Sequence, residues 1–259
     1  MSGMTEPADL ATLYMVRAWL AGARHIAVLT GAGVSAESGV PTFRDAQTGY
    51  WARFDPYEMA SEGGFRAQPA RVWGWYEHRR ELLRGVQPNA GHHALARFAR
   101  RQPGRLTLIT QNVDGLHQRA GSEDVLCLHG NLFDNRWLDT PRDCCWMEHA
   151  AAGNPPCCDR CGNLLRPGVV WFGEALPIAT LEAAQQAVQA CDVMLVVGTA
   201  GAVYPAAGLA HQARQAGARV VVINTGPSEL DAIAHAVLRG PSAQLLPALL
   251  EISNPAQGA

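Results

Sequence analysis

Polar and glycine residues follow several apolar segments of this chain, and they could bind a nucleotide. Gly31-Ala32-Gly33 comes directly after HIAVLT (25–30). Glycines let the backbone turn tightly and approach a pyrophosphate, which accepts hydrogen bonds from amide groups at a helix start. Ala36 stands where G-x-G-x-x-G has its third glycine, a replacement that the pattern tolerates. A plain turn between a strand and a helix would look the same.

Two further polar sites follow apolar segments. The run Gln111-Asn112-Val113-Asp114 comes after RLTLIT (105–110), and His129-Gly130 follows VLCL (125–128). Histidine has an unperturbed pKa of about 6.5, which suits proton removal near neutral pH. The plainer explanations are that the polar run caps a helix and that His129 is an ordinary polar residue at a strand end.

The cysteines point to a metal. Cys127 and Cys191 lie in apolar surroundings and are expected in the core. The N-terminal MSGMTEPADL lacks the basic and then apolar pattern of an export signal. In a cytoplasmic protein, a dense cysteine cluster indicates metal binding rather than disulfides. The other five cysteines fall within 18 residues: Cys144, Cys145, Cys157, Cys158 and Cys161.

The elements that must position these residues alternate between strand and helix patterns. Continuous apolar strands separated by helices predict an α/β fold, a Rossmann-like parallel sheet covered by helices on both faces. The predicted strands are 25–30, 105–110, 124–130, 192–199 and 218–225. The predicted helices are 8–23, 70–84, 90–101 with Asn89 as its cap, 177–190, 205–216 and 241–251.

In such a sheet, ligands bind where the strands end at their carboxyl side. The later strand ends carry Gly198-Thr199-Ala200 and Asn224-Thr225-Gly226, in addition to the three polar sites above. Residues 41–88 and 131–168 have few strand signals, so we assign them to a smaller lobe. The larger lobe then comprises about 8–40, 89–130 and 169–250, and both lobes form a single catalytic domain, 1–259.

The overall composition and net charge limit which partners the protein can bind. The 259 residues are 48% hydrophobic and 17% charged, with a formal net charge of −2. That balance provides no large positive field for nucleic acid or an anionic membrane. The longest uncharged stretch, 193–210, contains glycines and a proline and is interpreted as strand, loop and helix. We therefore expect a cytoplasmic protein, with neither nucleic acid nor membrane as partner, and a monomer.

Five sequence motifs, taken in their order along the chain, add to the evidence from these polar sites. GAGVSAESGVPTFR (31–44), TQNVDGLH (110–117), LHG (128–130), VVWFGE (169–174) and GT (198–199) together resemble the sirtuin family. The resemblance covers about residues 25–250. It implies a Rossmann-type large lobe, a small zinc-bearing lobe, and NAD-consuming removal of acyl groups from protein lysines between them.

The resemblance also implies roles for individual residues. Asn112 and Asp114 would hydrogen-bond the nicotinamide carboxamide and orient the ring, with His129 as catalytic base. Val170, Phe172 and Gly173 would provide an edge to which the acyl-lysine peptide adds as a strand. The residues assigned to NAD are Gly31, Ala32, Gly33, Glu37, Phe43, Arg44, Gln111, Asn112, Asp114, Gly198, Thr199, Ala200, Asn224, Thr225, Gly226 and Ser242.

The implied reaction runs in steps. The acyl-lysine carbonyl oxygen attacks C1′ of NAD, and nicotinamide leaves. His129 then deprotonates a ribose hydroxyl, which attacks the resulting imidate. Water releases free lysine and O-acyl-ADP-ribose.

The spacing Tyr76-x-x-Arg79 resembles the sirtuin branch that removes acidic acyl groups. Residues at i and i+3 share a helix face, so a phenol and a guanidinium could bind the carboxylate of succinyl- or malonyl-lysine. Ala60 could leave room for the longer chain. The alternative is one solvated basic face formed by Arg71, Arg79, Arg80 and Arg84.

The cysteine spacing departs from the family's two C-x-x-C pairs. Trp137-Leu138-Asp139-Thr140 stands where the first pair is expected. Cys158 and Cys161 form a proper second pair, and we expect Cys144 and Cys145 to complete a structural zinc site. Cys157 and His149 compete as ligands. The alternative is a metal-free lobe stabilised by packing.

The sequence also bears on three other functions. The Tyr76-x-x-Arg79 spacing argues against an ADP-ribosyltransferase, and intact His129, Asn112 and Asp114 argue against a non-catalytic NAD-binding sensor. A dehydrogenase that transfers hydride usually has an acidic residue near its second strand for the ribose. No such residue is evident here.

Overall fold

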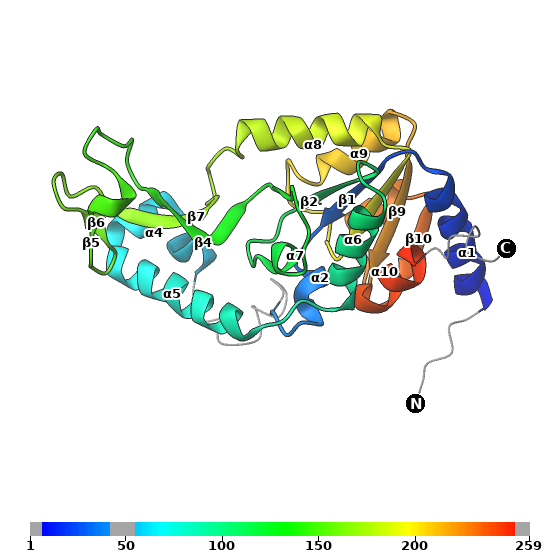
Figure 1. The fold of residues 1–259 in the computed structure, drawn as a ribbon, viewed down its shortest axis with the longest axis horizontal. Coiled ribbons are helices and arrows are strands. Elements are labelled where there is room, and N and C mark those ends of the chain that lie inside the picture. The colour runs from blue at the N-terminus through cyan, green and yellow to red at the C-terminus, as the bar shows by residue number, and fades with distance from the viewer. Residues whose placement is uncertain (1–6, 42–54, 252–259) are drawn as a thin grey trace.

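A computed structural model describes residues 7–41 and 55–251 of the chain. Its centre is a six-stranded parallel sheet with the order β10-β9-β8-β1-β2-β3 (Figure 1). The strands are β1 (Ile26–Thr30), β2 (Leu106–Thr110), β3 (Leu126–Cys127), β8 (Val193–Val197), β9 (Arg219–Asn224) and β10 (Ala236–Arg239).

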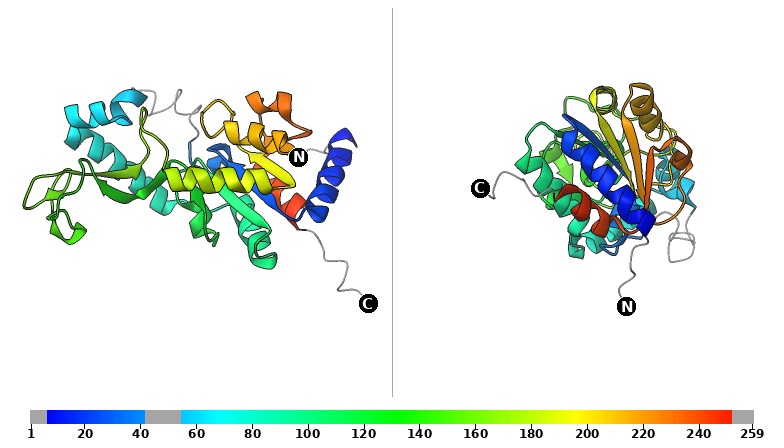
Figure 2. Two further views of the ribbon diagram at one scale, coloured as in Figure 1. Left: turned by 90° about the horizontal axis from the view of Figure 1, so that it is seen from above. Right: turned by 90° about the vertical axis from the view of Figure 1, so that its right-hand side faces the viewer.

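The central strands are buried because helices cover both faces of the sheet (Figure 2). Val28 points into a core shared with α1 (Pro7–Gly22), α6 (Ala90–Arg101) and α10 (Ser242–Leu250). Its neighbour Leu29 points the opposite way, into the core under α8 (Ile178–Ala190) and α9 (Gly208–Gln215). Every residue of β1 and β8 is buried, which explains their continuous apolar sequence.

The ends of the strands are aligned by their register. Thr30 of β1 pairs with Thr110 of β2 and Val197 of β8, so the loops that follow these three strands start at the same level. Two one-turn helices, α2 (Gly33–Ala36) and α7 (Leu116–Arg119), lie in these loops. The polar residues that follow β1, β2 and β8 therefore meet at one edge of the sheet.

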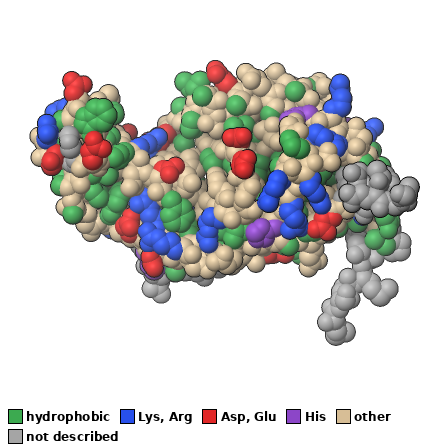
Figure 3. Space-filling view, viewed as in Figure 1, with side chains coloured by type: hydrophobic (Ala, Val, Ile, Leu, Met, Phe, Trp, Pro, Cys, Tyr) green, Lys and Arg blue, Asp and Glu red, His purple; other side chains and the backbone are tan. Residues whose placement is uncertain are grey.

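A second lobe extends from this edge (Figure 1). It has its own core, which includes Met59, Phe65, Tyr76, Leu132 and Trp171. On the face drawn in Figure 3, the surface is notched between the tip of this lobe and the main body. The lobe contains α3 (Pro56–Met59), α4 (Glu62–Ala67), α5 (Pro69–Gly85), β4 (Gly130–Trp137), a 3-10 turn (Met147–His149), β5 (Ala150–Ala151), β6 (Cys157–Cys158) and β7 (Leu165–Val169).

Arg80 attaches α5 to β4. Its guanidinium is 5% exposed and donates to the backbone oxygens of Leu132 (2.6 Å) and Asp134 (2.9 Å). It also donates to Asn135 Oδ1 at 2.7 Å and Glu77 Oε1 at 2.6 Å. These acceptors compensate for removing the charge from water.

The predicted fold class, the five strands and the six helices are confirmed. Three details differ. The sheet has a sixth strand, β10, whose four residues at the sheet edge were too short to produce a pattern. β3 pairs over two residues only, and the antiparallel pair β4–β7 was missed because Pro167 and Gly168 lie inside a strand.

Within the described ranges, no helix has both the length and the apolar character to cross a membrane. Acidic and basic side chains are interspersed on the face shown in Figure 3.

Replacing Asn89 should destabilise the fold. Its Oδ1 caps α6 by accepting from Gly91 N (2.9 Å), and its Nδ2 donates to Val34 O (2.8 Å) and Ser38 Oγ (3.0 Å). We expect Asn89→Ala to lower the free energy of unfolding by about 2 kcal/mol, measured by urea denaturation. Asn89→Ser keeps a capping oxygen and should recover about half of that loss. Equal losses in both variants would contradict the capping contribution.

Candidate active site

The loop after β1 packs backbone to backbone against the loop after β8. Gly31 N donates to Val197 O (2.9 Å), and Gly33 N donates to Gly198 O (2.8 Å). A Cβ on Gly33 would lie 2.7 Å from Gly198 Cα, and one on Gly31 would lie 2.8 Å from Thr199 Cβ. These glycines are needed for the close approach of two loops, and their own N–H groups are already used within the protein.

Gln111 and Asn112 connect the ends of three strands. Gln111 N donates to Thr30 O (3.0 Å), and its side-chain Nε2 lies 3.3 Å from Thr199 Oγ1. Asn112 Nδ2 donates to Gly31 O (3.1 Å) and lies 3.2 Å from Ser35 Oγ. The structure thus brings the predicted residues of the first, second and fourth strand loops together.

Asp114 is a buried carboxylate with both oxygens bonded. Oδ1 accepts from Leu116 N (2.9 Å) and Oδ2 from Ser35 Oγ (2.7 Å). The residue is 6% exposed. Burial raises the pKa of Asp114, while these hydrogen bonds and the positive charge of Arg79 act in the opposite direction.

Two buried histidines behind Asp114 were missed by the sequence analysis. Asn89 N donates to His92 Nδ1 (3.2 Å), so the proton of His92 is on Nε2, 3.3 Å from Ser35 Oγ. Ser35 in turn donates to Asp114. Burial lowers the pKa of His92 to about 4, so the ring is neutral at pH 7. A polar residue three positions after the helix cap was the available signal.

His117 lies beside the hydrogen-bonded chain of His92, Ser35 and Asp114. Its ring centroid is 4.8 Å from that of His92, and its Nε2 is 2.9 Å from Thr30 Oγ1. Thr30 already donates to Thr110 Oγ1 (2.8 Å), so His117 Nε2 is the donor to Thr30. Burial lowers the pKa of His117 to about 3. Its Nδ1 is buried without a hydrogen-bond partner among the described residues.

His129 lies between β3 and β4, half-buried. Its Nδ1 is 3.0 Å from Gln111 O. A carbonyl can only accept, so Nδ1 carries the proton and the lone pair of Nε2 remains for a base. Burial lowers the pKa of His129, partly offset by the bond to Gln111. Gly130 (φ +76°) must be glycine, because a Cβ would lie 2.0 Å from Gly168 O.

The segment after β7 holds the predicted peptide-binding residues. Val170 N donates to His129 O (2.8 Å) and Phe172 N donates to Ala60 O (2.8 Å). The Phe172 ring is 47% exposed and stacks on Tyr57, with centroids 5.6 Å apart. Gly173 follows in the left-handed region (φ +86°). The segment therefore joins His129 to α3 and presents an aromatic surface.

The residues predicted for adenosine lie on adjacent loops. Asn224 Nδ2 donates to Thr199 O (3.3 Å), so the loops with Gly198-Thr199-Ala200 and Asn224-Thr225-Gly226 touch. Arg239 of β10 donates to Gly226 O (2.9 Å).

Glu37 and Ser242, both predicted to contact NAD, lie next to each other at the start of α10. Glu37 Oε1 accepts from Ala243 N (2.9 Å) and lies 3.4 Å from Ser242 Oγ, so the carboxylate caps the start of α10. Phe43 and Arg44 lie outside the described residues, as does the side chain of His149.

The four arginines of α5 do not form one solvated face. Arg80 is buried against β4, and Arg84 pairs with Glu81 at the surface. Arg79 is half-buried, with its guanidinium 4.7 Å from the Trp75 ring centre and 5.9 Å from that of Tyr76. Burial lowers the pKa of Arg79, while electrostatic interaction with Tyr76 and Asp114 acts in the opposite direction. The Arg79 guanidinium therefore packs on two aromatic rings of its own helix.

Four cysteine sulfurs gather in the small lobe. All four lie within 4.8 Å of one another, with Sγ–Sγ distances of 3.5 Å for Cys145–Cys161 and 3.9 Å for Cys144–Cys158. Thiolates on a tetrahedral zinc with bonds of about 2.3 Å lie roughly 3.8 Å apart. The cluster of Cys144, Cys145, Cys158 and Cys161 fits a structural zinc, and Cys157 is outside it.

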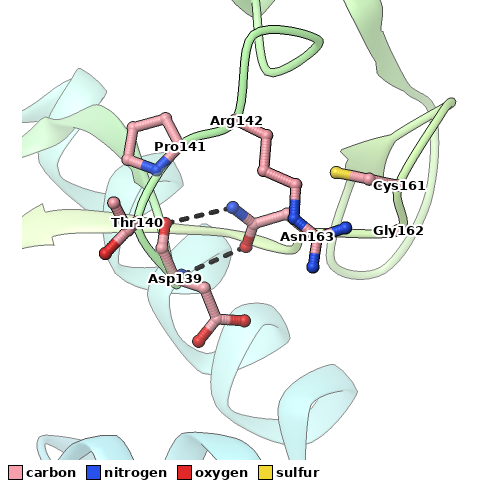
Figure 4. A pocket seen from close by; sticks show the side chains of 7 residues that line it. All are labelled: Asp139, Thr140, Pro141, Arg142, Cys161, Gly162 and Asn163. Atoms are coloured by element: carbon pink, nitrogen blue, oxygen red, sulfur yellow. Dashed lines mark hydrogen bonds between the residues drawn. The ribbon is translucent and has the colours of Figure 1, made fainter.

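Asn163 holds the two halves of this cluster together, at the edge of the pocket drawn in Figure 4. Its Oδ1 accepts from Asp139 N (3.1 Å) and its Nδ2 donates to Asp139 O (3.0 Å). Cys145 N donates to Arg142 O (2.8 Å), in the turn that brings two adjacent cysteines to one metal. This turn allows both Cys144 and Cys145 to belong to one cluster.

The fold and the site together define a class, namely a doubly wound nucleotide-binding protein with a second, tetracysteine lobe. A Sir2 family model matches residues 31–205. An NAD-dependent protein deacylase of Ralstonia nicotianae is 54% identical over 246 residues, 95% of this chain and 99% of the relative. NAD-dependent protein deacylase 1 of Pseudomonas aeruginosa is 49% identical over 91% of this chain and 97% of the relative.

Comparison with solved structures gives the same family. A Sir2 homologue in complex with NAD has a TM-score of 0.82 and 42% identity, covering 92% of both chains. A Sir2 protein bound to an acetylated peptide has a TM-score of 0.78 and 28% identity, covering 92% of this chain and 97% of that one. This chain belongs to the Sir2 family, the sirtuins.

Removing one cluster cysteine should release zinc. We expect one zinc per chain by elemental analysis, and Cys158→Ser to lower both zinc content and melting temperature, because three thiolates no longer close the tetrahedron. Cys157→Ser, in the neighbouring position outside the cluster, is the matched control and should keep both values. Protein purified without stoichiometric zinc, or equal losses in the two variants, would refute the assignment.

Proposed function

We propose that this chain is an NAD-dependent protein-lysine deacylase that prefers succinyl- and malonyl-lysine and also accepts acetyl-lysine. The main support for this activity is the geometry of His129. Its imidazole is neutral, Nδ1 donates to Gln111 O, and Nε2 remains as a base. The bond joins it to the strand end that carries Asn112 and Asp114. Membership of the Sir2 family supports the same conclusion.

NAD, when bound, supplies an activated ribose carbon with nicotinamide as its leaving group. Asn112 and Asp114 are fixed by bonds to the Gly31 loop, Ser35 and α7, so they can hold a carboxamide with little reorganisation. His129 Nε2 removes the proton of a ribose hydroxyl. Nicotinamide, free lysine and O-acyl-ADP-ribose are the products.

The rest of NAD would lie along the adjacent loops. The residues that we assign to it are Gly31, Ala32 and Gly33 for the pyrophosphate, with Gln111, Gly198, Thr199, Ala200, Asn224, Thr225, Gly226 and Ser242 along the nucleotide. This assignment rests on the Gly31-Ala32-Gly33 pattern after β1, because a glycine-rich loop at this point of a Rossmann-type sheet binds pyrophosphate. Glu37 acts indirectly, by capping α10 beside Ser242.

The protein substrate would enter along Val170, Phe172 and Gly173. Two bonds fix this segment, from Val170 N to His129 O and from Phe172 N to Ala60 O. The peptide would add beside this segment as a strand. The acylated lysine would then point toward His129.

Acidic acyl recognition rests on Tyr76 and Arg79. Both come from α5, and the Arg79 guanidinium lies 4.7 Å from the Trp75 ring centre and 5.9 Å from that of Tyr76, so the phenol and the guanidinium are neighbours. A guanidinium and a phenol can together bind a carboxylate. Ala60, whose carbonyl accepts from Phe172 N, is a small residue beside this region.

We also propose that both lobes work as one catalytic domain and that the enzyme is a cytoplasmic monomer without nucleic-acid or membrane partners. A reducing compartment keeps the four cluster thiols available for zinc. Light scattering at micromolar concentration measures the oligomeric state.

His129→Ala should reduce turnover by at least about 10²-fold, because the base is lost. NAD-dependent thermal stabilisation should persist. Release of free nicotinamide and the product mass of the peptide are the measurements, and they distinguish deacylation from hydride or ADP-ribosyl transfer. His211→Ala on α9 is the control, and near-normal turnover by His129→Ala would refute the assignment.

The activity of the wild-type enzyme should fall as the pH drops below the lowered pKa of His129, because the charged ring cannot accept a proton.

Arg79→Met should lower kcat/KM for a succinyl-lysine peptide by about 30-fold or more, since a buried charge partner is worth about 2–5 kcal/mol. Activity on the same peptide carrying acetyl-lysine should stay within a few-fold. Arg84→Met is the matched control, because Arg84 lies on the same helix but pairs with Glu81 at the surface. Equal losses on both substrates would exclude this role.

A further inference from the structure

A buried hydrogen bond holds the hydroxyl of Tyr76. Trp171 Nε1 lies 2.9 Å from Tyr76 Oη, and each residue is 2% exposed. An indole N–H is a donor only, so the tyrosine oxygen is the acceptor. This bond connects α5 to the segment after β7, 95 residues away.

The direction of this bond determines what Tyr76 can do. Its own O–H proton cannot be given to Trp171, because the indole nitrogen has no acceptor lone pair. The proton must point elsewhere, and a phenol that accepts one hydrogen bond becomes a stronger donor of another. Burial raises the pKa of Tyr76, so the hydroxyl keeps its proton at neutral pH. Tyr76 is thereby prepared to donate to an anionic group.

Trp171 is itself immobilised by charged neighbours. The guanidinium of Arg166 lies 3.2 Å from the indole ring centre and is 2% exposed. Arg166 donates to Val169 O (2.7 Å) and pairs through both terminal nitrogens with Glu174. Glu174 Oε2 also accepts from the backbone N of Trp171 (2.8 Å) and from Arg136 (2.7 Å). The indole therefore has little freedom to turn away from Tyr76.

The same segment also faces outward. Trp171 points into the small-lobe core, whereas its neighbour Phe172 is 47% exposed and stacks on Tyr57. Adjacent residues of one short segment thus reach the hydroxyl of Tyr76 and the surface assigned to the peptide.

We propose that Trp171 is a positioning residue for acidic-acyl specificity: its indole N–H fixes the Tyr76 hydroxyl as a donor to the distal carboxylate, and the Arg166–Glu174 pair fixes the indole. This inference rests on the proposed function, in which Tyr76 and Arg79 bind that carboxylate. It assigns to the VVWFGE segment a second role beyond contact with the peptide.

Trp171→Phe tests the inference, since it removes the N–H and retains an aromatic ring under Arg166. KM for a succinyl-lysine peptide should rise about 3- to 10-fold, the range for one buried neutral hydrogen bond, with kcat little changed. kcat/KM for the acetyl-lysine peptide should stay within about two-fold. Trp73→Phe is the matched control: Trp73 is buried in the same core beneath Arg80, with its ring centre 5.2 Å from that guanidinium.

A double-mutant cycle shows whether Trp171 acts through Tyr76. Tyr76→Phe should raise KM for the succinyl-lysine peptide, and adding Trp171→Phe should then change it by less than about two-fold. An undiminished effect of Trp171→Phe in the Tyr76→Phe background would overturn the inference. So would an unchanged KM in Trp171→Phe, or equal losses on the acetyl-lysine peptide.

An independent measurement needs no change at Trp171. In a nitrogen-15 spectrum, the Trp171 indole N–H should show slow hydrogen exchange in the wild-type protein and faster exchange in Tyr76→Phe, which lacks the acceptor. Unaltered exchange would overturn the inference. Two outcomes separate the inference from the proposed function. If the wild-type enzyme prefers acetyl-lysine and Tyr76→Phe leaves KM unchanged, the proposed acyl preference is wrong. If the wild-type enzyme prefers succinyl-lysine, Tyr76→Phe raises KM and Trp171→Phe leaves KM unchanged, only the positioning role of Trp171 is wrong.

Discussion

The close approach of two glycine loops is the constraint on which the site depends. Gly33 and Gly198 leave no room for a side chain between the loops that follow β1 and β8. Because β1, β2 and β8 end at the same register level, this contact also places Thr199 within reach of Gln111, and Gly31 O within reach of Asn112. A bulkier residue at either glycine would separate the two loops.

Buried polar groups behind these loops determine how rigid the site is. Asp114, Ser35 and His92 form one chain of hydrogen bonds, which ends at the cap of α6. A buried carboxylate is tolerated because both oxygens have donors, and both histidines stay neutral because burial lowers their pKa. The network fixes Asp114, the group that we assign to orienting nicotinamide.

The small lobe is stabilised by specific polar and sulfur contacts as well as by its core. Asn163 closes the loop that carries the cysteines, Arg80 joins α5 to β4, and Arg166 with Glu174 fixes the segment after β7. Each contact connects segments that are distant in sequence or irregular in backbone. These contacts fix the positions of α5, which carries Tyr76 and Arg79, and of the segment after β7 relative to the rest of the small lobe.

Sequence by itself determined the elements whose signals are local. Continuous apolar runs predicted β1, β8 and β9, and Asn89 predicted the start of α6, because burial on both faces and helix capping depend on neighbouring residues. The motifs also indicated His129, Asn112 and Asp114. Tertiary structure alone decided which four cysteines converge and that Glu37 caps α10. It also decided that Arg79 packs on Trp75 while Arg80 binds β4, and that Trp171 meets Tyr76. Their partners are set by strand order and lobe packing, which local periodicity does not encode.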